Sequence, residues 1–215
     1  MTNSNLVWLG ACVLAVVAIV WWAVAASPGA PGELTTVADP STLPGISTDM
    51  LATSTEQAST WPIELSHLAE RLDSEGIPHS NMEGQVLHIH QHLDLFVHGK
   101  SVGVPTNIGI HQAAGWLGAI HVHDTSGVIH VESPFEATYT LGQVFDTWGV
   151  RFTSSCIGGY CTDETNTLKV YVNGKLYEGD PRTLALDGHQ VIVVVYGSAA
   201  EAPAIPTTYN FAPGQ

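Results

Sequence analysis

The stretch "QVLHIHQHLDLFVHGK" (residues 85–100) sets the character of the chain, because polar and apolar side chains alternate along most of it. A period of two indicates a β-strand with one buried face. Ile89, Leu93 and Leu95 would form the core side. The other side would carry three histidines and an aspartate: His88, His90, His92 and Asp94. The His-Gly pair at 98–99 predicts a hairpin turn at the end of this strand.

A second stretch, "AIHVHDTSGVIHVES" (119–133), predicts another β-hairpin with the same mixture of residues. A two-residue turn at Thr125-Ser126 would place His121 opposite His130, with their β-carbons about 4.5–5.5 Å apart. The same face would also carry His123 and, one step further along, Glu132. The hairpin therefore offers three imidazoles on one surface.

Together the two stretches predict a metal site, because neighbouring His-X-His pairs on strands can supply three or four nitrogen ligands. The candidate ligands are His88, His90, His92, His121, His123 and His130. Asp94 and Glu132 could hydrogen-bond to ring N–H groups and orient them. Imidazole without sulfur ligands suits Cu(II) or Zn(II), and the affinity order favours copper, with zinc as the alternative. If the two His-bearing strands pair, the site could bind two ions.

Two other functions remain open for these histidines. An open metal site could activate water, with Glu132 or Asp94 as general base. The chain carries no metalloprotease helix signature, nucleophile elbow, phosphate loop or dinucleotide fingerprint, so binding is favoured over catalysis. Alternatively, the histidines could form a pH-responsive interaction surface that gains charge as the pH falls through about 6.5.

The N-terminal residues 1–26 predict a membrane anchor. Residues 6–26 run without a charge and are long enough to cross a hydrocarbon core of about 30 Å as a helix. A cleaved signal peptide and a lipoprotein signal at Cys12 are the alternatives. Residues 27–60, rich in Pro, Gly, Ser and Thr, predict a flexible linker. The expected topology is a single span in the cell membrane, with the bulk of the chain extracytoplasmic.

The net charge excludes one class of partner, and the cysteines indicate the redox state of the compartment. The formal net charge of −14 argues against nucleic acid as a partner, because phosphate binding requires clustered basic residues. Cys156 and Cys161 in "CIGGYC" could close as a disulfide in an oxidising compartment. A metal-binding dithiol is the competing interpretation of this pair.

The remaining pattern completes a mainly β fold with short helices, of the α+β class. Residues 61–78 predict a short amphipathic helix, and 140–149 predict a second one that begins at a capping threonine. An Asn-Gly turn at 173–174 and a buried strand at 189–197 follow. We therefore expect one His-rich metal-binding domain over 61–197 and a Pro-rich tail over 198–215.

Two resemblances accompany this pattern. Residues 138–197, with the blocks "TLGQVFDTWG", "VYVNGK" and "LALDGHQVIVVVYG", are similar to cobalamin-carrier and soluble-ligand-binding β-grasp domains, which implies one helix crossing a mixed sheet. Residues 86–197 resemble a group of membrane-anchored or secreted bacterial proteins with the same His-rich blocks. This second resemblance implies a place outside the cytoplasm and brings no activity. A role in metal delivery would make a membrane-bound metalloenzyme the partner.

Overall fold

The computed structural model describes residues 61–215. The predicted membrane anchor (1–26) and linker (27–60) lie outside the described residues. Within 61–215, no helix combines the length and the apolar character that crossing a membrane requires.

The described chain is mainly β with two short α-helices, which confirms the predicted α+β class. The helices are α1 (Leu68–Ser74) and α2 (Leu141–Trp148). The strands are β1 (His79–Ser80), β2 (Leu87–Val97), β3 (Lys100–Val102), β4 (Ile110–His111), β5 (Trp116–Gly118), β6 (Ile120–His121), β7 (Val128–Ser133), β8 (Cys156–Ile157), β9 (Tyr160–Cys161), β10 (Thr167–Val172), β11 (Lys175–Leu176) and β12 (Val191–Gly197).

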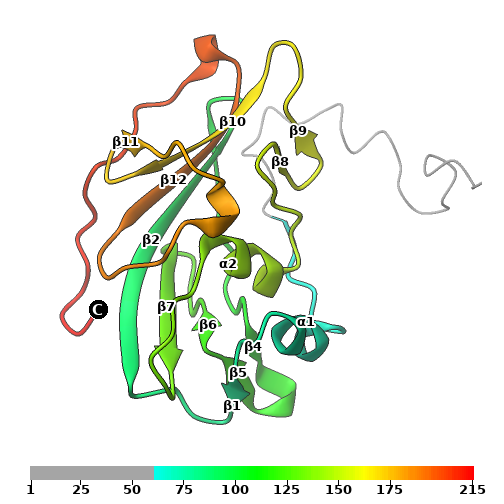
Figure 1. Ribbon diagram of the computed structural model, residues 1–215, viewed down its shortest axis with the longest axis vertical. Coiled ribbons are helices and arrows are strands. Elements are labelled where there is room, and N and C mark those ends of the chain that lie inside the picture. The colour runs from blue at the N-terminus through cyan, green and yellow to red at the C-terminus, as the bar shows by residue number, and fades with distance from the viewer. Residues whose placement is uncertain (1–60) are drawn as a thin grey trace, which may run out of the picture. The chain divides into compact units, whose positions relative to one another are not determined.

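Strands β1, β5 and β4 form a small sheet and β8 pairs with β9, whereas the other seven strands form one mixed sheet (Figure 1). Its strand order is β11-β10-β12-β2-β7-β6, and β3 pairs with β2 beyond the end of β7. Strand β12 runs parallel to β2, whereas the other neighbours are antiparallel. The long strand β2, which carries the first histidine row, therefore lies at the centre of the sheet.

The C-terminal elements that resemble a β-grasp domain do not form a separate sheet. The hairpin β10–β11 pairs with β12, and β12 in turn pairs with β2 from His92 to Val97. The sheet predicted over 138–197 thus continues into the histidine strand, which a local sequence pattern does not reveal.

Both hairpin turns that the sequence predicted at His-Gly and Asn-Gly are confirmed. His98 and Gly99 have φ of 50° and 73°, and Asn173 and Gly174 have φ of 50° and 80°. Two successive positive φ values match the twist of paired strands, and Asn and Gly tolerate them well. These turns join β2 to β3 and β10 to β11.

The main hydrophobic core lies on the helix side of the sheet. Leu93 and Leu95 of β2 are buried there with Phe145 and Trp148 of α2. Helix α2 begins at Thr140, whose side chain accepts a hydrogen bond from the backbone N–H of Gln143, in a complete capping box. The helix predicted at 140–149 is thereby confirmed, and its apolar face holds it against the sheet.

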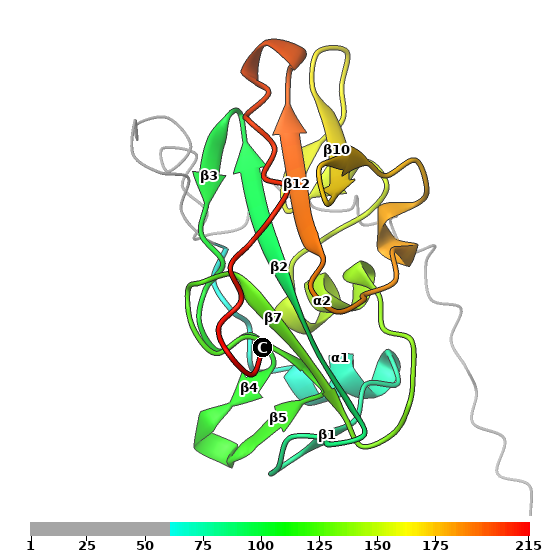
Figure 2. The same ribbon diagram turned by 90° about the vertical axis from the view of Figure 1, so that its left-hand side faces the viewer.

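The C-terminal segment crosses the opposite face of β2 and β12 (Figure 2). There, Val191, Val193 and Val195 form a smaller apolar cluster, and Ile205 and Tyr209 of the C-terminal segment pack against it. The segment covers only part of this face. The remaining part, toward β7 and β6, carries the histidines.

Candidate metal centre

Strand pairing places the two histidine-bearing stretches next to each other. In the β2–β7 ladder, His90 pairs with His130 and His88 pairs with Glu132. In the β6–β7 ladder, His121 pairs with His130. Directly paired residues point to the same face of a sheet. His90, His130 and His121 therefore form one row across three strands.

The predicted register of His121 opposite His130 and the turn at Thr125-Ser126 are confirmed, but the two strands do not pair all the way to that turn. Strand β6 ends at His121, and the next residue, Val122, forms backbone hydrogen bonds with Asn107 and Ile108 instead of continuing the hairpin. The chain thus leaves the sheet before His123. His123 lies in the following loop, and its ring points back toward His121 and His130.

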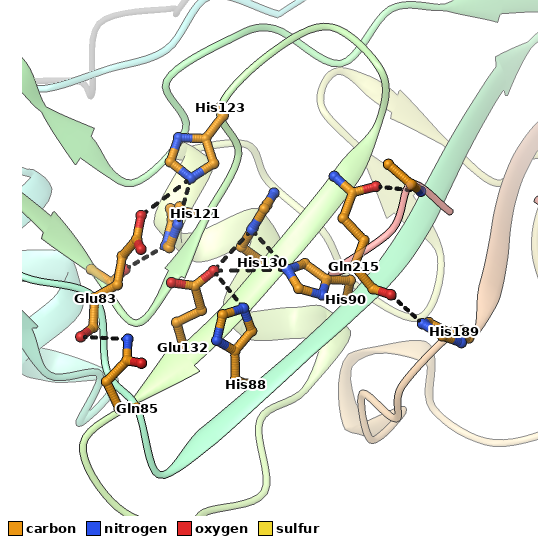
Figure 3. A network of polar contacts seen from close by, with 12 residues as sticks. Glu83, Gln85, His88, His90, His121, His123, His130, Glu132, His189 and Gln215 are labelled. Atoms are coloured by element: carbon orange, nitrogen blue, oxygen red, sulfur yellow. Dashed lines mark hydrogen bonds and ion pairs between the residues drawn. The ribbon is translucent and has the colours of Figure 1, made fainter. Parts of the chain in front are cut away.

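A first group of possible ligands consists of His121, His123 and His130 (Figure 3). Ligand atoms of all three lie within 4.8 Å of one another, and Nε2 of His121 is 3.1 Å from Nε2 of His123. The Nδ1–H of His121 donates to the carbonyl oxygen of Gly118 at 3.0 Å. Since a neutral imidazole carries one N–H, this bond leaves the Nε2 lone pair of His121 free to face its neighbours.

A second group consists of His88, His90 and Glu132, again within 4.8 Å of one another. Oε1 of Glu132 lies 3.3 Å from Nε2 of His88 and 3.8 Å from Nε2 of His90. The two groups meet at His130, whose Nδ1 is 3.0 Å from Nε2 of His90 and 3.0 Å from Oε1 of Glu132. Three imidazoles, those of His88, His90 and His130, therefore lie around one carboxylate.

Glu132 is unusual because it is a buried acid with no Lys or Arg beside it. Its side chain is 3% exposed, and within residues 61–215 its ion pairs are with His88, His90 and His130. The second oxygen, Oε2, is buried and has no hydrogen-bond partner. A third group joins Glu132 and His121 to Glu83, which lies in the loop between β1 and β2. No sequence pattern indicated Glu83, because it belongs to no periodic segment.

Burial keeps two of the histidines neutral. For His121, loss of hydration lowers the pKa to about 4. For His90, burial and the neighbouring His130 and His88 also lower the pKa to about 4. Burial acts to raise the pKa of Glu132, but the hydrogen bond from His130 and the nearby imidazoles outweigh it, and the pKa falls below its ordinary value. Near neutral pH the row thus combines unprotonated nitrogens with an ionised carboxylate.

His92 and Asp94 lie apart from these groups, which differs from the predicted ligand set. The ring of His92 stacks on Tyr209 of the C-terminal segment with centroids 3.8 Å apart, and its Nε2 is 2.9 Å from the carbonyl oxygen of Ser126. Asp94 lies 3.4 Å from Nδ1 of His92 and pairs with it. His92 belongs to none of the three ligand groups. The C-terminal segment accounts for the difference, because it occupies the face above His92.

Two pockets give access to the cluster. A pocket of about 340 Å³ is lined by Glu83, Glu132, Gly118 and neighbouring residues of β5 and the β1–β2 loop. A second pocket, of about 540 Å³, is lined by His88, His90 and His189. The side chains of His88 and His123 are 41% and 45% exposed, whereas His90 and His121 are buried. An ion could therefore enter from solvent and reach buried nitrogens.

The spacing of one nitrogen pair, that of His121 and His123, suits a first-row metal ion. With metal–nitrogen bonds of about 2.0–2.1 Å, two nitrogens on one ion lie roughly 2.9 Å apart at a right angle and roughly 3.3 Å apart at the tetrahedral angle. The observed 3.1 Å between His121 and His123 falls within this interval. The donors are nitrogen and oxygen, which suit Cu(II) and Zn(II). Cys156 and Cys161 form the expected disulfide and offer no thiolate.

Comparisons with known proteins assign no family to this arrangement. No family model matches the chain, and no curated protein or solved structure is significantly similar to it. The residues of the cluster are therefore what indicates a function.

Proposed function

We propose that this chain is a membrane-anchored, extracytoplasmic metal-binding protein that captures, buffers or delivers copper through its clustered histidines. The convergence of His121, His123 and His130 carries the proposal. Three imidazoles held by a strand pair and a carbonyl hydrogen bond form a ligand set whose geometry exists before the ion arrives. Such preorganisation lowers the cost of binding.

Copper is proposed ahead of zinc on chemical grounds. Nitrogen ligands without a strict geometry bind Cu(II) more tightly than Zn(II). The formal net charge of −14 attracts cations of either kind, so it raises the local concentration of metal ions without selecting between them. Zinc remains the alternative, and direct competition between the two ions decides between them.

The extracytoplasmic location and the membrane anchor are parts of this proposal. The disulfide between Cys156 and Cys161 supports an oxidising compartment. The charge-free segment 6–26 supports an anchor. A delivery role would require a metal acceptor in the same membrane, for which a membrane-bound metalloenzyme is the proposed partner.

We also propose a β-grasp-type architecture for the domain. The order β3-β2-β12-β10-β11, the parallel pairing of β2 with β12, and helix α2 between the two hairpins support it. Strands β4 to β7 would then be an insertion that supplies three of the six predicted histidine ligands, His121, His123 and His130. The architecture explains the placement of the site and implies no ligand of its own.

A metal-dependent enzyme is the second candidate function. The exposed rings of His88 and His123, together with the pocket beside Glu132, favour it, because catalytic zinc sites keep one position open to water or substrate. A bound ion with an exchangeable water would support this candidate. A pH-responsive role is less well supported, since burial keeps His90 and His121 neutral until the pH is near 4.

The test is metal analysis of the full-length chain, purified in detergent, stripped with a chelator and reloaded with Cu(II), Zn(II) or both. We expect stoichiometric binding and preferential retention of copper. Replacing His121, His123 and His130 together by Ala should abolish binding to this group. His67→Ala is the matched control, because His67 is exposed and pairs with Glu70 on α1. Unchanged copper content in the triple variant would refute the assignment.

A variant at an exposed position guards against misfolding. His123→Ala removes a half-exposed ligand and leaves the buried His121 in place. Loss of an outer hydrogen-bond partner of a ligand typically weakens metal affinity about 10–100-fold, so loss of a ligand itself should weaken it at least tenfold. An unchanged affinity in this folded variant would count equally against the proposal.

A further inference from the structure

We propose that the domain holds a second metal ion, bound by His88, His90 and Glu132 beside the ion at His121, His123 and His130. This proposal rests on the proposed function, because it assumes that the first group binds metal. It adds a separate ligand set and a bridge between the two ions. The cluster would then be a two-ion centre.

Glu132 is buried inside the histidine cluster. A carboxylate with 3% exposure has lost nearly all of its hydration, and a buried charge is costly unless it is paired. In the described chain Glu132 pairs only with histidines, which are charged only when protonated, and with no Lys or Arg. A divalent cation would supply the missing positive charge.

One carboxylate oxygen of Glu132 has no hydrogen-bond partner. Oε1 of Glu132 lies within 3.3 Å of His88 and 3.0 Å of His130, but Oε2 is buried without any hydrogen-bond partner. Buried polar atoms in native proteins are nearly always satisfied. A carboxylate with one oxygen toward each ion would satisfy both oxygens, which is the usual way in which a carboxylate bridges a metal pair.

The two ligand groups are separate but adjacent. His88 and His90 come from β2, whereas His121 and His123 come from β6 and the loop after it. Strand β7 lies between them and contributes His130 and Glu132 to the two groups. The close-up shows His88 and His90 on one side of Glu132 and His121 with His123 on the other (Figure 3). Metal pairs in two-ion sites are typically about 3.5–4 Å apart.

Solvent can reach the ligands of the second group through two pockets. The pocket that contains Glu83 also contains Glu132, and the pocket on the other side contains His88 and His90. Each ligand of the second group therefore borders a solvent-accessible space, which an ion needs to enter. Glu83, grouped with His121 and Glu132, offers a further oxygen at the pocket side.

The experiment measures metal stoichiometry and coupling in the full-length chain, with Cu(II) alone as the probe. We expect two copper ions per chain. The double variant His88→Ala/His90→Ala and the near-isosteric Glu132→Gln should each retain one. His79→Ala is the matched control, because His79 pairs with Asp73 outside the cluster, and it should keep both ions.

Electron paramagnetic resonance supplies a second readout. Two Cu(II) ions a few ångströms apart couple magnetically, so the fully loaded chain should show a broadened spectrum whose integrated spin is below its copper content. The His88→Ala variant, which changes a ring that is 41% exposed, should restore the spectrum of an isolated ion with one spin per copper.

The outcomes separate this inference from the function on which it rests. One copper per chain, unchanged by His88→Ala/His90→Ala, overturns the second ion and leaves the three-histidine site standing. Two coppers with fully isolated spins overturn the bridged pair. No copper in the wild-type chain overturns both proposals.

Discussion

Acidification should destabilise the metal-free domain well above the pH at which carboxylates protonate. His121 is completely buried, and burial lowers its pKa from an ordinary 6.5 to about 4. In the unfolded chain His121 therefore binds a proton near pH 6.5, whereas in the folded chain it binds one only near pH 4. Stability contributed by the neutral ring is complete above 6.5 and is lost as the pH falls between these values. Each pKa unit corresponds to 1.36 kcal/mol, so His121 alone should cost about 3 kcal/mol at about pH 4.

The assay is urea unfolding of a 61–215 fragment in excess chelator, followed by tryptophan fluorescence at about pH 7 and about pH 4. His90 titrates in the same direction, so the total loss in the wild-type fragment should exceed the share of His121. The matched variant His121→Gln keeps a hydrogen-bond donor but has no titratable ring. Its loss between the two pH values should be smaller by about 3 kcal/mol. Equal losses in the two proteins would refute the account of His121 as a buried neutral imidazole.

Two further predictions concern metal and disulfide. Copper at a hundredfold excess over its dissociation constant should stabilise the fold by about 2.7 kcal/mol per site, because the ion binds the folded ligand set, and a rise in the thermal midpoint that a chelator reverses would check this. Reduction of the Cys156–Cys161 disulfide should cost roughly 2 kcal/mol, since it closes a loop with a sequence separation of 5. Copper content should be unchanged after reduction, because the histidine row shares no strand with this loop; loss of copper on reduction would contradict the separation of the two features.

The parts of the fold that depend on local pattern were predictable from the sequence. Alternation identified β2, and the spacing between His121 and His130 predicted their register, although the strands do not pair up to the turn between them. The helix signal at Thr140 and the Asn-Gly turn at 173–174 also matched the structure. In each case the residues that decide the conformation are neighbours in sequence.

The composition of the candidate site depended on contacts between distant segments, which local pattern cannot supply. The pairing of His90 with His130, 40 residues apart, brings the two histidine stretches together. Tyr209 stacks on His92 and separates it from the cluster. Glu132, expected to orient ring N–H groups or to act as a general base, lies among the possible ligands because β7 pairs with β2. An alternating pattern shows which face a side chain occupies and gives no information on what covers that face.

The parallel pairing of β2 with β12 has a consequence for how the domain reaches its native state. Strand β2 ends at Val97, and its parallel partner β12 begins only at Val191. The edge of β2 that pairs with β12 therefore stays unpaired until almost the whole domain has emerged during synthesis. Contacts of such high sequence separation form slowly, and an exposed apolar edge invites pairing with other chains. Chains truncated before residue 191 should therefore aggregate through the half of β2 that follows the histidines.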